Sequence, residues 1–338
     1  MEEFNVVFQD CTSLGTKIKK EEYLEFGKYP IIDQGQNEIA GYTNHENGIY
    51  KDVPAIIFGD HTRVIKYVDK PFYLGADGVK LLKCKKESAN YKYLYYALKN
   101  ARVPDTGYNR HFKWLKEISI NYPEPSKQLK VVENLDKLSN IIEQRKEQIK
   151  LLDNLIKSRF VEMFGDTISN SKEWEIKQLQ EVGSWKSGGT PSRTNKDYFS
   201  GDIDWYSAGE LNELYLEESV EKITQEAISE SSAKIFTRGS MLVGMYDTAA
   251  FKMGILKKDS ASNQACANVM PNENVNIVWL YYNLSHMKEH FLSNRRGIRQ
   301  KNLNLGMIKE FEIPVPPIDL QNQFATFVQQ VDKLKVAY

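Results

Sequence analysis

The segment KEISINYP, residues 116–123, returns as KEFEIPVP at residues 309–316, and each copy precedes a stretch with a helical pattern. Further along, LDKL at residues 135–138 returns as VDKL at residues 331–334. The distance between the copies therefore changes by about three residues, close to one turn of a helix. A repeat of this kind indicates a duplicated module, and it divides the chain into two halves of similar size.

Length and composition also favour two globular units. The chain has 338 residues, and typical domain sizes of about 150 residues make two the expected number. A hydrophobic content of 41% is enough for a core in each half, and no run approaches the ~18 apolar residues of a membrane helix. The start, Met1-Glu2-Glu3, lacks the pattern of a signal peptide. We therefore expect a cytoplasmic protein without a membrane partner.

Cysteine usage and charge narrow the function further. Cys11, Cys84 and Cys266 lie far apart, so we expect neither a disulfide framework nor a Cys-x-x-Cys metal site. The 45 basic and 45 acidic side chains cancel, which argues against binding polyanions through bulk charge. Locally, however, residues 83–117 hold nine Lys/Arg against three acids, and residues 286–301 hold five against one. Each half thus ends in a basic tract, although ordinary solvated surface is an alternative explanation.

Residues 126–164 carry the strongest structural pattern. Ser126 is a suitable N-cap after Pro123 and Pro125. The apolar residues that follow have the 3.5-residue repeat of a coiled-coil seam: Val131, Leu135, Leu138, Ile142, Ile149, Leu152, Ile156 and Met163, with Arg145 and Arg159 at the two vacant positions. Such a helix is about 58 Å long. The second copy offers only Phe327, Val331, Leu334 and Tyr338, in a shorter helix from about Asp319.

These patterns predict an α+β fold, in which two mixed α/β domains are separated by a long coiled-coil helix and followed by a shorter C-terminal helix. The predicted boundaries are 1–122 for the first domain, 123–165 for the first helical spacer, 166–316 for the second domain and 317–338 for the second spacer. Predicted strands are 53–58, 64–68, 79–82, 234–236 and 241–245, and predicted helices are 90–100 and 276–294.

Enzyme motifs are weak in this sequence. His286-Met287-Lys288-Glu289-His290 matches the His-x-x-Glu-His zinc pattern, but no third ligand is evident, and Lys288 with the downstream arginines would repel a dication. The Gly-rich segment 187–191 lacks the Lys-Ser/Thr of a phosphate-binding loop. We find no catalytic constellation and expect no enzyme. A metal-dependent hydrolase using His286 and His290, or a single-chain restriction-methyltransferase, stays open as an alternative.

Two basic loops with aromatic and amide residues, 106–113 and 294–302, precede the repeated Lys-Glu segments. Arg and Lys bond guanine edges or phosphates, and Asn and Gln bond adenine, so the loops predict binding of double-stranded DNA. The candidate residues in these loops are Tyr108, Asn109, Arg110, Lys113, Arg295, Arg296, Arg299, Gln300, Lys301 and Asn302. Further loop candidates are Asp60, His61, Thr62, Arg63, Tyr246, Asp247 and Thr248. A coiled-coil scaffold that binds protein partners is the alternative.

Several further segments match a known family. They are YPIIDQG (29–35), IAGY (39–42), FGDHTR (58–63), GADG (75–78), SRFVEMFGD (158–166), WEIKQL (174–179), GGTPS (188–192), NQAC (263–266) and IPVPP (313–317). With them, essentially the whole chain resembles the specificity (S) subunit of type I restriction-modification enzymes.

The resemblance implies a function without catalysis. Each domain would read one part of a split DNA sequence, while the two helices would pair antiparallel, fix the distance between the halves and dock two methyltransferase (modification) subunits. S-adenosylmethionine would belong to the methyltransferase and ATP to restriction subunits that join as further partners, so this chain would hold no cofactor. The family's second helix runs longer than residues 317–338. We therefore expect a truncated second spacer whose missing seam comes from a second copy or another polypeptide.

Overall fold

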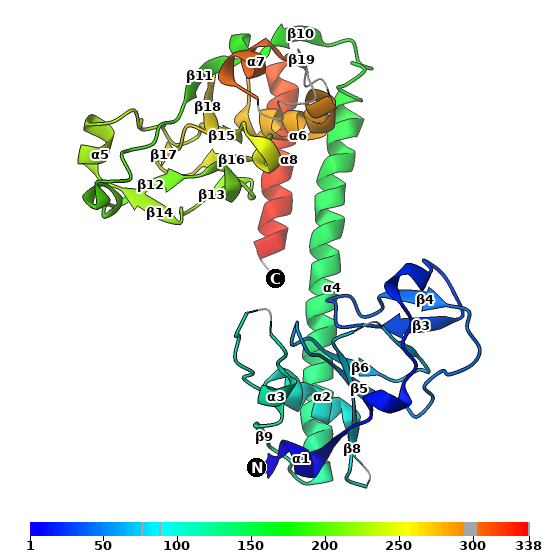
Figure 1. Cartoon of the computed structure of the whole chain (residues 1–338). Coiled ribbons are helices and arrows are strands. Elements are labelled where there is room, and N and C mark those ends of the chain that lie inside the picture. The colour runs from blue at the N-terminus through cyan, green and yellow to red at the C-terminus, as the bar shows by residue number, and fades with distance from the viewer. Residues whose placement is uncertain (76, 88, 108, 294–302, 337–338) are drawn as a thin grey trace. The chain divides into compact units, whose positions relative to one another are not determined.

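The computed structural model describes residues 1–75, 77–87, 89–107, 109–293 and 303–336, and it contains two compact units (Figure 1). Unit 1 comprises Met1–Arg145 and unit 2 comprises Lys146–Tyr338. The long helix α4 (Pro125–Phe164) begins in unit 1 and ends in unit 2. The predicted fold class, mixed α/β units with a long helix between them in the sequence, is confirmed. Among the described residues, we find no helix with the length and apolar character needed to cross a membrane.

Unit 1 combines short helices with three small sheets. Its strands are β1 (Glu2–Glu3), β2 (Phe8–Asp10), β3 (Tyr29–Ile32), β4 (Gly41–Thr43), β5 (Ala55–Gly59), β6 (Ile65–Val68), β7 (Tyr73–Leu74), β8 (Val79–Cys84) and β9 (Ser119–Ile120). Its helices are α1 (Phe4–Val7), α2 (Tyr91–Lys99), α3 (Phe112–Leu115) and the first turns of α4, and the sheets have the orders β2-β8-β5-β6, β4-β3-β7 and β1-β9. All five residues of β5 are buried, so this apolar strand forms the centre of the larger sheet.

Unit 2 has the same kinds of elements. Its strands are β10 (Glu175–Gln178), β11 (Gly183–Ser187), β12 (Ile203–Tyr206), β13 (Tyr215–Leu216), β14 (Glu221–Ile223), β15 (Met241–Gly244), β16 (Met253–Leu256), β17 (Ala261–Ser262), β18 (Cys266–Pro271) and β19 (Glu312–Val315). Its helices are the last turns of α4, α5 (Gln225–Ser229), α6 (Ile277–Ser293), α7 (Leu305–Glu310) and α8 (Ile318–Val336). The sheet orders are β11-β18-β15-β16-β13, β14-β12-β17 and β10-β19.

The two units repeat one topology. The order β2-β8-β5-β6 corresponds to β11-β18-β15-β16, and β4-β3-β7 corresponds to β14-β12-β17. In both three-stranded sheets the central strand has one antiparallel and one parallel neighbour. The helices follow the same sequence, since α2, α3 and α4 correspond to α6, α7 and α8. The duplication that the sequence predicts is therefore confirmed at the level of the fold.

Equivalent side chains confirm the register of this repeat. Gln128 and Gln321 are both buried near the start of a helix, and each donates its side-chain N–H to a proline carbonyl, Pro123 or Pro316, at 2.7 Å. A further repeat was missed in the sequence: Leu-Tyr-Tyr at 94–96 of α2 returns at 280–282 of α6. A repeat of three residues can arise by chance, so the sequence alone does not establish it. The equivalent positions of α2 and α6 in the two units do.

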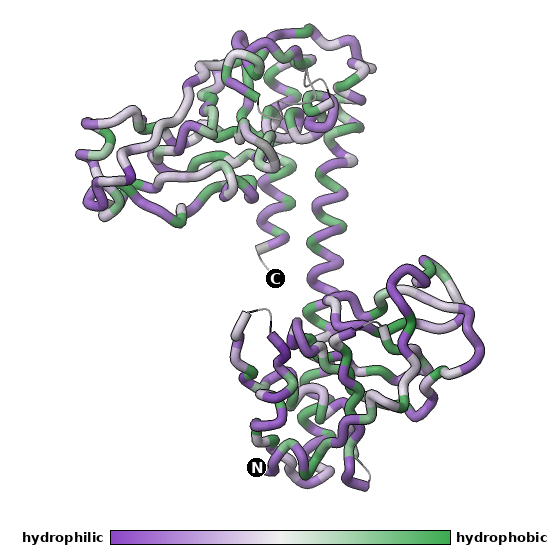
Figure 2. Tube along the Cα trace, in the orientation of Figure 1, coloured by the Kyte–Doolittle hydropathy of each residue, from purple (hydrophilic) through white to green (hydrophobic). Residues whose placement is uncertain are grey.

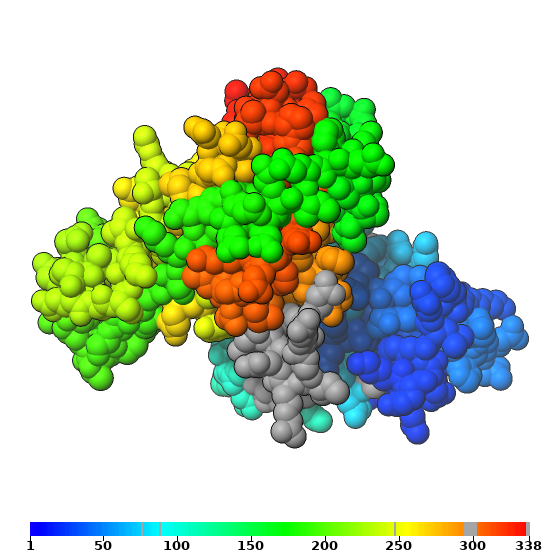
Figure 3. Space-filling model, turned by 90° about the horizontal axis from the view of Figure 1, so that it is seen from above, coloured from blue at the N-terminus to red at the C-terminus, as the bar shows by residue number. Residues whose placement is uncertain are grey.

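Helix α8 packs antiparallel against the end of α4. Near the start of α8, the ring of Phe324 lies 5.4 Å from that of Phe160 and 5.5 Å from that of Phe164. Near its end, Lys335 pairs with Asp153 at 2.8 Å. On the face seen in Figure 3, the segment that follows α4 (green) lies between the start of α8 (red) and α7 (orange).

The predicted seam of α4 is incomplete at its C-terminal end. The predicted seam residue Ile156 is buried, and Leu152 and Met163 pack against the same core, but the prediction missed Phe160 and Phe164, which are also buried. The phenylalanines present the larger apolar surface to α8, and this surface decides which face of the helix turns inward. The central part of α4 alternates between apolar and polar residues (Figure 2). Within the described chain its apolar residues Leu138, Ile141, Ile142, Ile149 and Leu151 are exposed.

The shorter predicted elements agree with the structure in all but one case. The predicted strands at 53–58, 64–68, 79–82 and 241–245 correspond to β5, β6, β8 and β15, and the two predicted helices to α2 and α6. The predicted strand at 234–236 is wrong, because only Phe236 makes an isolated bridge, to Ser260. A turn with Gly239 at a φ of 82° follows at once and ends the pairing.

Candidate functional site

Four loops of unit 1 meet where strands β3, β5 and β7 end. They comprise residues 33–35, 60–63, the described part of 75–78 and the described part of 103–112, and we call them loop cluster 1. Backbone and side-chain bonds join them: Asp60 N donates to Gly78 O at 2.7 Å, and His61 N donates to Gln34 Oε1 at 3.1 Å. Thr62 donates its hydroxyl to Gln34 O at 2.6 Å. The family-like segments at 29–35, 58–63 and 75–78 thus form one assembly.

Asp60 and His111 fasten the basic loop to the end of β5. His111 N donates to Asp60 O at 2.7 Å, and Phe112 N donates to Asp60 Oδ1 at 2.7 Å. The His111 ring is buried, with Nδ1 3.1 Å from Asp60 O. Because a carbonyl can only accept, Nδ1 carries the proton, and Nε2 accepts from Thr106 N at 3.4 Å. The carboxylate of Asp60 is therefore occupied inside unit 1, and sequence reasoning overlooked His111.

Arg63 also joins the loop 60–63 to the described part of the loop 103–112. Its guanidinium pairs with Asp105 at 2.6 Å, and the residue adopts a φ of 61°, where a side chain other than glycine is uncommon. The Gly107 N–H and the Arg63 guanidinium hold the pKa of Asp105 below its ordinary value. Since strained backbone is kept only where the surroundings fix it, Arg63 marks a loop with a defined shape.

A buried lysine of β6 contacts the loop that follows β3 in loop cluster 1. Lys66 of β6 is 1% exposed, lies 3.5 Å from Asp33 Oδ1 and donates to Asn37 O. Burial lowers the pKa of Lys66, and the nearby Asp33 offsets part of this effect. The loop that follows β3 is therefore attached to the sheet through a charged group, which fixes the position of Gln34.

The exposed side chains of loop cluster 1 are the ones that a ligand can reach. Thr62, Asn109, Arg110 and Lys113 are exposed, and the Lys113 ammonium lies 4.8 Å from the ring of Trp114. Asn109 donates its amide to Thr106 O. Tyr108, another candidate, lies outside the described residues. The structure thus brings Asp60, His61, Thr62, Arg63, Asn109, Arg110 and Lys113 into one region, as members of a single group of loops.

The basic tract 83–117 is less available than its composition indicates. Lys86 pairs with Glu2 and Lys92 with Asp136, both at 2.6 Å. Lys83 bonds to Asp52, and Lys85 donates to Asn5 O. These four cations are used within unit 1, so the candidates for a polyanionic ligand narrow to the exposed basic residues Lys99, Arg102, Arg110, Lys113 and Lys116.

Unit 2 has an equivalent assembly, which we call loop cluster 2. It comprises residues 188–190, 207–210, 246–248, 263–265 and Leu303. Met245 N donates to Ala265 O at 2.9 Å, and Leu303 N donates to Met245 O at 2.9 Å. The second bond corresponds to that from His111 to Asp60 in unit 1. Tyr246 and Thr248 are exposed, whereas the side chain of Asp247 is not described.

The remaining candidates of unit 2 flank this assembly in the sequence. Arg295, Arg296, Arg299, Gln300, Lys301 and Asn302 lie outside the described residues, so their roles stay predictions. The described chain stops at Ser293 and resumes at Leu303, which bonds to the residue before the 246–248 loop. Leu303, the first described residue after these candidates, therefore belongs to loop cluster 2.

Close backbone contacts explain the family-like glycines of loop cluster 2. A Cβ at Gly189 would collide with the backbone of Ser232, and Gly189 O accepts from the indole N–H of Trp205 at 3.0 Å. Next to it, the Thr190 hydroxyl donates to Gln264 Oε1. The segments GGTPS and NQAC therefore face each other across this cluster, and their residue types serve close packing and loop attachment.

The proposed zinc motif has a different environment. His286 Nε2 lies 3.3 Å from Asp166 Oδ1, and its ring lies 5.7 Å from that of Phe160. Bonds from Ser169, the backbone of Ile168 and His286 lower the pKa of Asp166. Within the described part of the chain, no three His, Cys, Asp or Glu side chains gather as a metal site would require. The sequence motif therefore does not predict the contact between His286 and Asp166.

Comparisons with known proteins agree on one family. The family model for the type I restriction modification DNA specificity domain matches residues 8–151 and 171–337. The specificity subunit of the type I restriction enzyme EcoR124I/EcoR124II from Escherichia coli is 27% identical over an alignment 338 residues long, and this alignment covers 94% of this chain and 82% of that protein. The MjaIX specificity subunit of Methanocaldococcus jannaschii is 30% identical over 168 residues, covering 48% of this chain and 39% of that protein.

Solved structures agree on the fold. The type I restriction-modification S subunit from M. genitalium superposes with a TM-score of 0.61 at 16% identity, covering 100% of this chain and 90% of that one. A structure from work on complex assembly and conformational transition of the type I restriction-modification system has a TM-score of 0.54 at 14% identity, covering 99% and 89%. At these identities the likeness concerns architecture alone.

Proposed function

The chain belongs to the family of type I restriction-modification DNA specificity domains, and we propose that it reads a split DNA sequence, one part with each loop cluster. The observation that carries the proposal is the duplicated fold, in which the same loops come together at equivalent strand ends of both units. Two copies of one reading module fit a target with two specified parts. A single continuous site would need only one.

We assign the direct contacts to the exposed side chains of the loop clusters. In unit 1 these are Arg110 and Lys113, with Asn109 as the amide that can read adenine. In unit 2 we assign this role to Tyr246, Thr248 and the basic segment 294–302. Asp60 and Arg63 would position the loops, since their charged groups bond inside unit 1. A good bidentate base contact discriminates by about 1–3 kcal/mol, so a few such residues give useful specificity.

We assign partner docking to helix α4. Apolar side chains on one side of its central part are exposed, with Leu138 at 54%, Ile142 at 53% and Ile149 at 44%. An exposed apolar stripe of this kind marks an interaction surface. In this proposal it receives two methyltransferase subunits, which would bring S-adenosylmethionine, while ATP would act in restriction subunits. The role of this chain would then be recognition, with the chemistry left to its partners.

Footprinting tests this assignment. The chain, assembled with its methyltransferase subunits, is bound to a library of DNA fragments, and the protected sequences are compared. We expect two short specified segments separated by unspecified bases, since each unit reads one segment. Protection of fragments without a shared split sequence would contradict the proposal and favour a scaffold that binds protein.

A further inference from the structure

Gln34 lies at the centre of loop cluster 1, in the loop that follows β3. His61 N donates to Gln34 Oε1 at 3.1 Å, and Gln34 Nε2 donates to Asp77 O at 3.2 Å. The backbone oxygen of Gln34 also accepts from the Thr62 hydroxyl at 2.6 Å. One residue thus joins its own loop to two others, and both polar atoms of its side chain are used inside unit 1.

These bonds fix the direction of the amide and the residue type that can make them. A backbone N–H can only donate and a carbonyl can only accept, so Oε1 must face His61 and Nε2 must face Asp77. A glutamate of the same length would place an oxygen against the Asp77 carbonyl, and a methionine would bond to neither group. The position therefore requires an amide of this length.

Two glycines leave this amide little room to move. A Cβ at Gly78 would lie 2.5 Å from Gln34 Nε2, and a Cβ at Gly59 would lie 2.9 Å from Gln34 Cβ. Both separations are shorter than van der Waals contact, so only glycine permits the approach. Gln34 therefore touches the backbone where the loop after β5 begins and where the loop before β8 ends.

The backbone around Gln34 is itself fixed. Gly75 N donates to Ile32 O at 2.8 Å, and Gly35 N donates to Asp33 Oδ1 at 2.8 Å. The buried ammonium of Lys66 lies 3.5 Å from the same carboxylate oxygen. Because its own loop is attached to the sheets in this way, Gln34 can determine where the neighbouring loops lie.

The loop held by Gln34 in turn holds the loop that carries Arg110. Phe112 N donates to Asp60 Oδ1 at 2.7 Å, and Arg63 pairs with Asp105 at 2.6 Å. A displacement of the first loop would therefore displace the exposed side chains of the second. Base contacts need groups placed to within about 0.5 Å, so a small shift is enough to change which base is accepted.

Unit 2 has no such amide at the equivalent place. Strand β12 corresponds to β3, and Tyr206 ends β12 as Ile32 ends β3. Ala208 therefore stands in unit 2 where Gln34 stands in unit 1. A substitution of Gln34 should act on loop cluster 1 and leave loop cluster 2 unchanged.

We propose that Gln34 is a positioning residue for DNA reading by unit 1, whose amide sets the spacing of the loops in loop cluster 1 and thereby the choice of bases. The inference rests on the proposed function, in which each unit reads one segment of a split sequence. Gln34 itself would touch no base, since its polar atoms are bonded inside the unit. Its effect would be on the precision of recognition in one segment.

Selection from a random DNA library tests the proposal. The chain, assembled with its methyltransferase subunits, selects fragments, and sequencing gives the base preference at each position. Gln34→Met keeps the size of the side chain but removes both amide bonds, so the preference in one segment should fall about fivefold or more, while the other segment keeps its preference. Gln34→Glu, which turns an acceptor toward the Asp77 carbonyl, should act alike and carries the test if Gln34→Met does not fold.

Gln36→Met is the matched control, two residues further along the chain. The Gln36 side chain is exposed, so this substitution should leave both segments unchanged. Equal relaxation by Gln36→Met and Gln34→Met would overturn the proposal. An unchanged base preference with both Gln34→Met and Gln34→Glu would overturn it as well.

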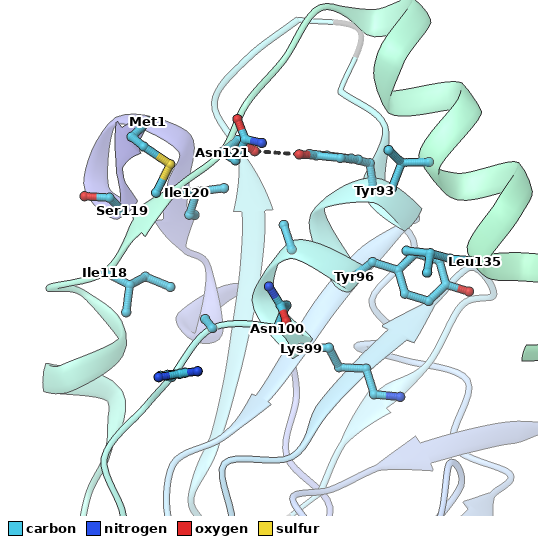
Figure 4. A pocket seen from close by; sticks show the side chains of 14 residues that line it. Met1, Tyr93, Tyr96, Lys99, Asn100, Ile118, Ser119, Ile120, Asn121 and Leu135 are labelled. Carbon is cyan, nitrogen blue, oxygen red and sulfur yellow. Dashed lines mark hydrogen bonds between the residues drawn. The ribbon is translucent and has the colours of Figure 1, made fainter. Parts of the chain in front are cut away.

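A second control separates positioning from a general loss of stability. Unit 1 contains a cavity of about 780 Å³ lined by Tyr93 and Tyr96, and its lining residues in the described chain all lie outside loop cluster 1 (Figure 4). Tyr93→Phe deletes the bond from the Tyr93 hydroxyl to Asn121 O, so it should lower the melting temperature and leave the base preference unchanged. If Tyr93→Phe widened the choice of bases as Gln34→Met does, the positioning role would be wrong.

Two outcomes distinguish this inference from the proposed function. An unsubstituted complex that selects no split sequence would contradict the proposed function, and the role of Gln34 with it. A split sequence that Arg110→Ala with Lys113→Ala relaxes in one segment, but that Gln34→Met and Gln34→Glu leave unchanged, would overturn the role of Gln34 alone.

Discussion

Single residues of the loop clusters divide into those that hold loops and those that reach outward. Asp60 and His111 bond to each other across 51 residues of sequence, while Arg110 and Lys113 between and beside them stay exposed. The sequence could nominate the segments, because basic, amide and aromatic residues gather there. It could not assign the roles, because these depend on bonds between loops that meet only in the folded chain.

Asp60→Ala tests this division. Its removal leaves Phe112 N without its buried acceptor, so we expect the free energy of unfolding to fall by about 1–3 kcal/mol. Arg110→Ala, at an exposed position, should change that free energy by less than about 0.5 kcal/mol yet weaken DNA binding. Denaturant titration and DNA titration of both variants give the comparison. An Asp60→Ala protein of unchanged stability that loses DNA binding would make Asp60 a direct contact.

A buried aspartate of unit 2, paired with an exposed lysine, predicts a dependence of stability on pH. Asp204 of β12 accepts from Lys258 at 2.8 Å and from Ser219 N at 2.9 Å. Burial by itself raises the pKa of Asp204, but the bonds to Lys258 and Ser219 outweigh it, so the pKa lies below its ordinary value. The stabilisation is therefore present above about pH 4 and lost as the pH falls through the lowered pKa.

Asp204→Asn should lower the unfolding free energy at neutral pH by about 1–3 kcal/mol. Its difference from the unsubstituted chain should shrink as the pH drops below about 4, where the carboxylate takes up a proton. Asp202→Asn, two residues away and exposed, is the control and should follow the unsubstituted chain. Thermal unfolding measured from pH 7 to pH 2 checks this. A difference that stays constant over the range would refute the assignment.

At the scale of elements, the helices show what periodicity can and cannot predict. The 3.5-residue pattern predicts α4 almost to its ends, because apolar spacing reports helical geometry directly. It does not predict that Phe160 and Phe164 are buried. Two neighbouring stripes of the helix are both apolar, and the packing partner determines which side chains become buried. That partner is α8, whose Phe324 meets both rings.

The duplicated helices provide a matched pair of substitutions. Phe324→Ala should lower the unfolding free energy of unit 2 by about 3–5 kcal/mol, because it opens a cavity among buried aromatic rings. Val131→Ala, at the equivalent place in unit 1, should cost about 1 kcal/mol or less, because this side chain is 38% exposed. Chemical denaturation of both variants measures the two costs. Similar large losses would show that the start of α4 is already covered.

At the scale of the whole molecule, the repeat is the most predictable feature. Residues 116–123 and 309–316 reveal the duplication in the sequence, and the sheets of both units then follow one strand order. The predicted domain boundaries stay a prediction, since the compact units meet within α4, at Arg145 and Lys146. Because α4 is one continuous helix, its amino-acid composition does not change at the residue where unit 1 ends and unit 2 begins.

The most direct test of the central claim is to sequence the methylated bases in a host that expresses the chain with its methyltransferase subunits. The account predicts two short specified segments separated by unspecified bases. With Arg110→Ala and Lys113→Ala together, the choice of bases should widen in one segment, while the other keeps its sequence. A single undivided site, or equal relaxation of both segments, would contradict the claim that each unit reads its own half.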